Sequence, residues 1–202
     1  TGHVSECFAD GHVTGTEYVG GLLGYAFQGA IEKTYAAGWI TGRSNVAGLI
    51  GYADEYTSLE QSYSATAILN SPDGAGCVNA SETCTVTSSF WDIAVSGCSS
   101  SGGGEGLDTA AMMRTGTYTG AQWAVSPPGK TATVWTMQDG ASYPYFSWAV
   151  ENGAAIGPRL VSSYRGIAAG EPNPAGMPPY SLVWVTAQPK SGFWFAGWYG
   201  SG

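Results

Sequence analysis

The stretch Val4-Ser-Glu-Cys-Phe-Ala-Asp-Gly-His-Val-Thr-Gly decides the fold, because it returns 27 residues later as Ile31-Glu-Lys-Thr-Tyr-Ala-Ala-Gly-Trp-Ile-Thr-Gly. A third copy begins 28 residues after the second, at Leu59. Three positions recur in all three copies: an aliphatic residue, an aromatic residue four positions later and a second aliphatic residue nine positions later. The three series are Val4, Ile31 and Leu59; Phe8, Tyr35 and Tyr63; and Val13, Ile40 and Ile68.

A period of 27–28 residues is typical of one coil of a β-solenoid, in which short strands are separated by turns. Each coil would pair its backbone with a neighbour about 4.8 Å away, so equivalent side chains would stack as ladders. A β-sandwich with chance internal similarity is the less favoured alternative. We expect glycines to supply turns and positive φ at the coil corners. They are Gly11, Gly15, Gly21, Gly24, Gly38, Gly42, Gly48 and Gly51.

The composition agrees with an all-β protein and limits its partners. The chain has 31 glycines in 202 residues and 44% hydrophobic residues, which is enough apolar surface to form a core. Its net charge is −8, and its seven Lys and Arg residues are scattered, which argues against a nucleic-acid partner. No apolar run approaches the roughly 18 residues of a spanning helix, so we expect no membrane insertion.

Two segments carry a resemblance to a known family. Tyr18-Val-Gly-Gly-Leu-Leu-Gly-Tyr and Asn45-Val-Ala-Gly-Leu-Ile-Gly-Tyr resemble the GLUG motif of bacterial and archaeal surface proteins. Ser89-Phe-Trp-Asp-Ile-Ala-Val-Ser-Gly, Gly106-Leu-Asp-Thr-Ala-Ala-Met-Met and Tyr143-Pro-Tyr-Phe-Ser-Trp are similar to landmarks that follow such repeats. The resemblance covers roughly residues 1–150. It implies a β-helical, adhesin-like extracellular module without catalytic residues.

We expect three regions: a β-solenoid of about three to four coils over residues 1–95, a cap over 96–153 and a small β module over 154–202. The aromatic-rich cap should cover the open end of the solenoid, because an exposed coil is an unpaired sheet edge. Asp108 should begin one short helix as its N-cap. Residues 70–85 are expected to form a loop that interrupts the third coil. The segment 99–106 is expected to be flexible.

The C-terminal region carries a second resemblance. Leu182-Val-Trp-Val-Thr-Ala-Gln-Pro and Gly192-Phe-Trp-Phe-Ala-Gly-Trp-Tyr resemble the end of an internalin-type B repeat, a small β module common in surface proteins. A complete module would continue beyond this point, so the module is either abbreviated or cut.

The four cysteines favour disulfide bonds in an exported, acidic chain. Cys77 and Cys84 would close a short loop. Cys7 and Cys98 would lie roughly 14 Å apart along the solenoid axis, beyond the roughly 7 Å that a disulfide spans between Cα atoms. They would be free, paired between molecules, or joined by a cap that folds back. Asn79 begins a glycosylation sequon.

The sequence predicts no catalytic residue, no metal site and no cofactor. His3 and His12 are two ligands at most, without the cysteine or histidine spacing of a zinc site, and we interpret them as residues of solvated turns. Asp54, Glu55 and Asp92 could form a glycosidase pair only if they shared one face. The repeat does not place them so, and we expect the protein not to be an enzyme.

Three functions remain open, all at the cell surface or outside the cell, although this numbering shows no signal sequence. The first is a structural or adhesive surface module, with other surface proteins as partners. The second is a self-assembling filament, in which Leu182–Val185 or Phe193–Tyr199 of one subunit pairs with the open first coil of the next by β-augmentation. The third is carbohydrate binding by exposed aromatic residues among the eight tryptophans and twelve tyrosines.

Overall fold

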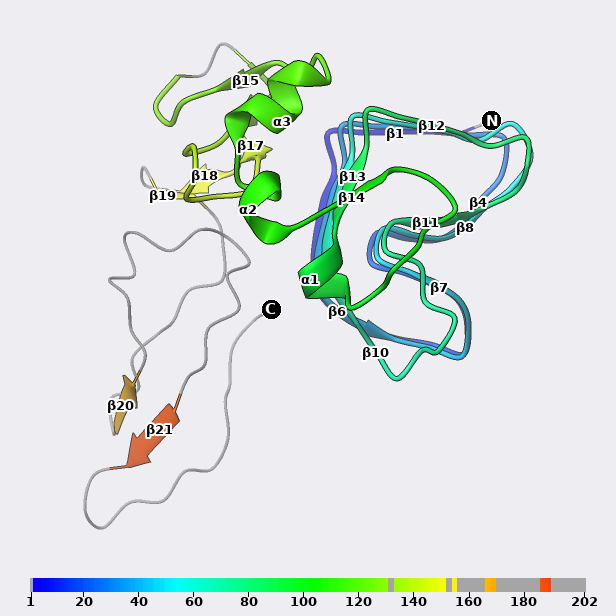
Figure 1. Ribbon diagram of the computed structural model, residues 1–202, viewed down its shortest axis with the longest axis horizontal. Coiled ribbons are helices and arrows are strands. Elements are labelled where there is room, and N and C mark those ends of the chain that lie inside the picture. Colours follow the sequence, from blue (N-terminus) through cyan, green and yellow to red (C-terminus); the bar gives the residue numbers. More distant parts are fainter. Residues whose placement is uncertain (1, 131–132, 152–153, 156–165, 170–185, 190–202) are drawn as a thin grey trace.

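The computed structural model describes residues 2–130, 133–151, 154–155, 166–169 and 186–189. Within these ranges the chain is mostly β-strand, and its first part winds into a parallel β-solenoid of three turns and a partial fourth (Figure 1). The prediction of an all-β solenoid is confirmed. The described residues hold three short helices, where the sequence predicted one.

Each coil of the solenoid contains up to four short strands. In the first coil they are β1 (His3–Ser5), β2 (Phe8–Thr14), β3 (Glu17–Gly20) and β4 (Leu23–Ala26). The later coils repeat the order. Their strands are β5 (Ala30–Glu32), β6 (Tyr35–Thr41), β7 (Ser44–Ala47) and β8 (Ile50–Ala53), then β9 (Ser58–Glu60), β10 (Tyr63–Leu69) and β11 (Val78–Ala80), then β12 (Thr85–Thr87) and β13 (Phe90–Asp92).

The strands stack in register along the solenoid axis. The sheets run in the order β1-β5-β9-β12, β2-β6-β10-β13, β3-β7 and β4-β8-β11, and every pairing between these strands is parallel. The register places repeat-equivalent residues directly opposite each other. The paired series are Val4, Ile31, Leu59 and Val86; Phe8, Tyr35, Tyr63 and Phe90; and Val13, Ile40 and Ile68.

Side chains on the β2-β6-β10-β13 sheet alternate between the inside and the outside of the solenoid, as the period of two in a strand requires. Ala36 faces an inner cluster that contains Ile31 and Leu59. Ile40 faces a second inner cluster with Val19 and Val46. The aromatic series points outward instead. Rings in neighbouring coils, from Phe8 to Tyr35 and from Tyr35 to Tyr63, stack with centroids 5.0 Å apart.

Glycines separate the two inner clusters at a narrow waist of the coil. They are Gly21, Gly48 and Gly76. A Cβ atom on each would lie within 3.0 Å of an inward side chain on the next coil, so no larger residue fits without a shift of the chain. The glycines serve close approach and not positive φ, which corrects the expectation for Gly21 and Gly48. The three contacts join Gly21 to Ala36, Gly48 to Ser64 and Gly76 to Trp91.

Positive φ at the coil corners is supplied mainly by other residues. Among the eight repeat glycines only Gly38 has a positive φ, of 95°. The corner between the first and second strands of each coil places a non-glycine residue in the left-handed region. These residues are Glu6, Lys33, Gln61 and Ser88, with φ between 45° and 50°.

The segment 70–85 continues the third coil and does not interrupt it, contrary to the prediction. It contains β11, which pairs with β8, and its amides bind the preceding coil from Ser81 to Ala53 and from Thr85 to Thr57. The polar sequence of this segment suggested a loop. Its backbone is nonetheless satisfied by the coil above, as buried backbone must be.

The fourth coil is cut short and covers the C-terminal end of the solenoid. After α1 (Ile93–Ser96) the chain crosses to β14 (Glu105–Leu107), which pairs with β13. In the crossing segment, the Ser101 hydroxyl bonds the backbone of Cys77, Val78 and Gly103. The prediction of a flexible 99–106 tract is therefore wrong, because the Ser101 side chain and the Gly102 and Glu105 amides bond the backbone of earlier residues.

The cap follows β14 and contains two helices and three two-residue strands. Asp108 is the N-cap of α2 (Thr109–Met112), where its carboxyl Oδ1 accepts from the Ala111 N–H at 2.7 Å, as the sequence predicts. The other elements are α3 (Thr115–Gly120), β15 (Val125–Ser126), β16 (Trp135–Thr136) and β17 (Tyr145–Phe146).

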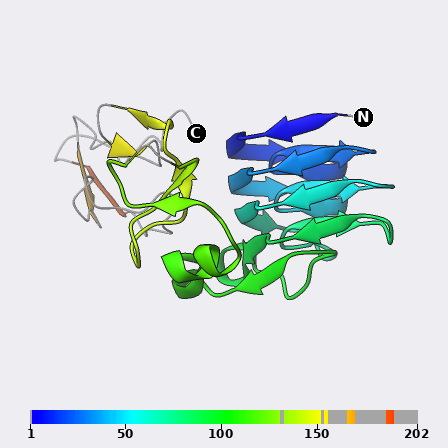
Figure 2. The same ribbon diagram turned by 90° about the horizontal axis from the view of Figure 1, so that it is seen from above.

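The cap packs against the side of the solenoid and not on its end, which corrects the expected position. Figure 2 shows it beside the stacked coils. The outward aromatic series of the solenoid forms one buried cluster with the cap. The apolar surface that needed cover was therefore on the side of the coils. The cap contributes Met112, Tyr118, Trp123, Trp135, Met137, Tyr143, Phe146 and Ala149 to this cluster.

Polar contacts fix the cap to this face. The Tyr143 hydroxyl donates to the carboxyl Oδ2 of the fully buried Asp92 at 2.6 Å, and the Tyr63 hydroxyl donates to the carbonyl of Pro144 at 2.6 Å. The Tyr143 ring also stacks on Tyr63, at 6.0 Å and 7°, so it extends the aromatic series of the solenoid. Burial and the Asp92 contact raise the pKa of Tyr143.

Two antiparallel strand pairs are described after β17: β18 (Val150–Glu151) with β19 (Ala154–Ala155), and β20 (Gly166–Ala169) with β21 (Thr186–Pro189). The segments Leu182–Val185 and Phe193–Tyr199 lie outside the described residues. The predicted boundaries at 95/96 and 153/154 stay predictions, although the parallel ladder runs on to Leu107. No helix in the described ranges is long and apolar enough to cross a membrane.

Candidate functional site

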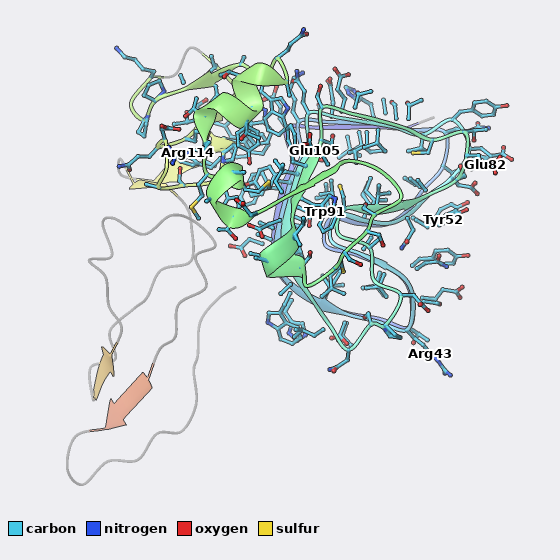
Figure 3. All side chains as sticks on the ribbon, viewed as in Figure 1. Arg43, Tyr52, Glu82, Trp91, Glu105 and Arg114 are labelled. Carbon is cyan, nitrogen blue, oxygen red and sulfur yellow. The ribbon has the colours of Figure 1, made fainter. Side chains whose placement is uncertain are left out.

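Three tyrosines of the solenoid lie together on the side away from the cap. Tyr18 and Tyr25 are 41% and 47% exposed, and Tyr52 is partly exposed. Figure 3 shows Tyr52 on the opposite side of the solenoid from Arg114 of the cap, with Trp91 between them. We call Tyr18, Tyr25 and Tyr52, with the neighbouring Asp54, the tyrosine cluster.

Glycines of the repeat create the backbone reversal that carries this cluster. The chain turns back between β3 and β4, so Tyr18 at one end of the reversal meets Tyr25 at the other. A Cβ atom on Gly24 would lie 2.5 Å from the Tyr18 carbonyl oxygen, and one on Gly51 would lie 2.7 Å from the Tyr18 carbonyl carbon. Only glycine lets the two arms approach this closely.

The backbone at Tyr18 is strained. Its φ is 54°, in the left-handed region that bulky side chains rarely adopt. The equivalent position of the next coil is Asn45, with φ of 50°, and asparagine tolerates this region much better. A strained tyrosine that stays 41% exposed is not fixed by burial in the core, which directs attention to a role at the surface.

The three rings are in mutual contact. Tyr25 and Tyr52 occupy equivalent positions on β4 and β8, and their rings stack with centroids 6.1 Å apart and planes 13° apart. Tyr18 meets Tyr25 nearly edge-on, at 5.4 Å and 77°, and Tyr52 at 6.2 Å and 66°. The rings therefore form one continuous aromatic surface held by paired strands.

Asp54 gives the cluster a polar rim. Its Oδ2 accepts from the Tyr25 hydroxyl at 2.6 Å, and its Oδ1 accepts from the Glu55 N–H at 2.8 Å. The Tyr25 bond, followed by the Glu55 bond, lowers the pKa of Asp54. The same bond raises the pKa of Tyr25 to about 12. At neutral pH the rim is a charged carboxylate beside a protonated phenol.

Asn79 ends the tyrosine series in the third coil. This coil has one residue fewer between the positions that pair with Ile50 and Ala53, so Asn79 replaces the Gly-Tyr of earlier coils. Its side-chain Nδ2 donates to the carbonyls of Val46 and Gly51, at 3.2 and 2.9 Å. The nitrogen that a glycan would modify is therefore engaged within the coil, and this geometry argues against the predicted glycosylation.

The predicted Cys77–Cys84 disulfide is absent, and all four cysteines are free thiols. Cys77 is completely buried in the inner cluster, and Cys84 and Cys98 pack against the same cluster. Burial raises the pKa of all three thiols, that of Cys77 to about 12. The corner that the disulfide would close is held by inter-coil backbone bonds. Cys7 is exposed.

The other polar candidates from the sequence do not converge. His3 and His12 lie in strands and not in turns: His3 contacts Glu32, and His12 stacks on Trp39. Asp92 is fully buried in its contact with Tyr143, whereas Asp54 is on the surface. No group of three or more His, Cys, Asp or Glu side chains suited to a metal ion occurs among the described residues.

A polar hollow of about 560 Å³ lies between the turn at 71–75 and the segment 96–102. Asp73 and Cys98 are its ionisable residues, and serines and glycines form most of the rest. It brings no charged pair or nucleophile–base pair together. The tyrosine cluster is therefore the stronger candidate site.

A comparison with known families gives one match: a model of the GLUG motif covers residues 15–41. This segment runs from the turn before β3 to the end of β6 and includes Tyr18 and Tyr25. No curated protein and no solved structure gives a significant match to the chain. The chain thus carries a GLUG repeat module, and the likeness to an internalin-type B repeat stays a prediction.

Sequence reasoning counted the aromatic residues but did not find the tyrosine cluster. The available signal was the Gly-Tyr pair that ends both copies of the motif, at Tyr25 and Tyr52. The backbone reversal that adds Tyr18 was not visible, because it depends on close approach at the glycines.

Proposed function

We propose that this chain is a non-catalytic, extracellular structural and adhesive module that acts through the tyrosine cluster. One observation carries the proposal: three aromatic side chains are held together on the surface by paired strands of a repeat scaffold. Exposed apolar residues that form a contiguous patch mark a contact site, whereas singly scattered ones need no explanation. The GLUG motif at residues 15–41 supports an extracellular location, because the motif resembles that of bacterial and archaeal surface proteins.

The proposal is tested in two parts. Intact cells that carry the gene are treated with protease, and the released peptides are identified by mass spectrometry. We expect peptides of this chain without lysis. Beads coated with purified protein are then tested for attachment to such cells and to extracellular matrix. Attachment should fall when Tyr25 and Tyr52 are replaced by alanine. A chain found only after lysis would overturn the proposal.

A second candidate function is favoured by the first coil. Strands β1–β4 have a partner on one side only within the described residues. Such an edge can accept another strand, so a second copy of the chain stacked head-to-tail would give a filament. Alternate amides of β2 face β6, as the bond from the Gly15 N–H to the Thr41 carbonyl shows. The His12 N–H therefore faces the free edge.

This placement gives a specific test of the filament. His12→Pro removes a donor from the free edge and leaves the pairing with β6 in place. We expect wild-type protein to form elongated particles in electron micrographs and the variant to stay short. Trp39→Ala, which removes the stacking partner of His12 from the neighbouring strand, is the control and should still assemble. Monodisperse wild-type monomers at high concentration would contradict the filament.

A further inference from the structure

The tyrosine cluster has the surface chemistry that suits a sugar ring. Tyrosine combines an apolar ring face with a polar hydroxyl, so it can pack against the C–H face of a pyranose and also hydrogen-bond. The hydroxyls of Tyr18 and Tyr52 have no hydrogen-bond partner in the described part of the chain, so a ligand would find them free. The rings are positioned in advance by paired strands, which lowers the entropy lost on binding.

The rim provides acceptors for sugar hydroxyls. An ionised carboxylate has about four acceptor positions, and the two hydrogen bonds to Asp54 occupy only part of them. Hydrogen bonds to a charged acceptor are the stronger kind. Asp54 can thus accept from ligand hydroxyls while it still holds Tyr25.

Charge and ring geometry narrow the class of ligand. An acidic polysaccharide would be repelled by Asp54, by the adjacent Glu55 and by a chain with net charge −8. A cation cage holds its ligand between separated ring faces. Here the rings contact each other at 5.4–6.2 Å and leave no such gap. A neutral ligand that lies across the outer aromatic surface satisfies both conditions.

We propose that the tyrosine cluster binds neutral polysaccharides, with the rings of Tyr18, Tyr25 and Tyr52 as the stacking surface and Asp54 as the hydroxyl acceptor. The proposal rests on the adhesive function above and names its ligand class. Because the tyrosine series spans two coils, it presents a surface longer than one ring, which favours a chain over a single sugar.

The test measures binding of the whole purified chain by titration calorimetry and affinity electrophoresis. The probes are neutral cellohexaose and chitohexaose, cationic chitosan hexamer and anionic oligogalacturonate. We expect saturable binding to at least one neutral probe and none to the anionic one. Tyr25→Ala and Tyr52→Ala should each weaken that binding by about tenfold. Asp54→Asn should weaken it less, because the amide keeps one acceptor oxygen.

Trp39→Ala is the matched control, because it removes another exposed aromatic residue from the outer surface of a different strand. It should leave binding unchanged. Circular dichroism verifies that each variant is folded. Equal loss in all variants, binding only to the cationic probe, or no binding to either neutral probe overturns the glycan proposal. If coated beads still attach to cells through the tyrosines, the adhesive function survives with a different ligand.

Discussion

Both sides of the solenoid carry a series of stacked aromatic rings, but one series is buried and the other is exposed. On the side of the cap, Phe8, Tyr35 and Tyr63 stack with centroids 5.0 Å apart, and Tyr35 and Tyr63 have no exposed surface. On the other side, Tyr25 and Tyr52 stack at 6.1 Å, and Tyr25 is exposed and Tyr52 partly exposed. Both series follow from equivalent positions in successive coils.

The difference teaches that a ladder position alone does not define a core. The parallel register brings equivalent aromatic residues together on any face of the coil. What separates the two series is the second layer, because the cap buries one and no described segment buries the other. Stability therefore depends on one series, and the other is available for contacts with a partner.

The largest expected effect is on the buried series. Tyr63→Ala removes a fully buried ring and its hydrogen bond to Pro144, so we expect a loss of about 3–5 kcal/mol in the free energy of unfolding. Tyr52→Ala, in the exposed series, should cost far less. Urea denaturation followed by tryptophan fluorescence measures both. Similar losses in the two variants would abolish the distinction between the faces.

A smaller effect is expected where the cap is fixed to the solenoid. Asp92→Ala leaves the Val95 N–H and the Tyr143 hydroxyl without their buried acceptor and should cost about 2–4 kcal/mol. Tyr143→Phe removes only the hydroxyl. A double-mutant cycle should give a coupling energy of about 1–3 kcal/mol. The cycle of Tyr25→Phe with Asp54→Ala is the exposed control, and an equal coupling there would contradict the comparison.

The smallest effect is a local titration. The hydrogen bond from the Tyr25 hydroxyl to Asp54 raises the pKa of Tyr25 from 10.0 to about 12, so the folded state favours the protonated phenol. The resulting stabilisation is complete below pH 10 and is lost as the pH rises through about 12. For Asp54, whose pKa is lowered, the stabilisation is lost as the pH falls through that lowered value.

Ultraviolet absorbance of phenolate measures the tyrosine titration. Compared with Tyr25→Phe, wild-type protein should show one additional phenol with a pKa of about 12. Asp54→Asn should return that pKa toward its ordinary value. Burial raises the pKa of Tyr118 and Tyr143, which should ionise only when the cap unfolds. If all the phenols ionise together, the hydrogen bond between Tyr25 and Asp54 does not form in solution.

The sequence was sufficient to predict the solenoid because the repeat is local. Aliphatic residues at fixed offsets specify both the strands and their register, so Val4, Ile31 and Leu59 meet as the period requires. The sequence could not place the cap. Outward and inward aromatic residues look alike in a repeat, and the contacts that show which face is covered, such as that of Tyr143 with Asp92 and that of Tyr63 with Pro144, join residues far apart in the sequence.

Polar composition gave a wrong prediction for two segments. The segment 70–85 contains Ser-Pro-Asp-Gly, and the segment 99–106 is rich in serine and glycine. Both patterns favour loops, but both segments lie on the preceding coil and use it to satisfy their backbone. The disulfide failed for a related reason. Two cysteines that are close in sequence were assigned to a loop, whereas Cys77 belongs to the interior of a coil.

The glycine waist determines what can be exchanged between such repeats. Each waist glycine lies against a side chain of the next coil, and the size of that side chain differs from coil to coil. The pairs are Gly21 with Ala36, Gly48 with Ser64 and Gly76 with Trp91. A recombination boundary at the corner between β4 and β5 would separate Gly21 from its matched partner Ala36. The unit that can be duplicated or transplanted therefore begins and ends in mid-coil, between an inward residue such as Ala36 and the next glycine, Gly48. A designer who lengthens this solenoid should cut there.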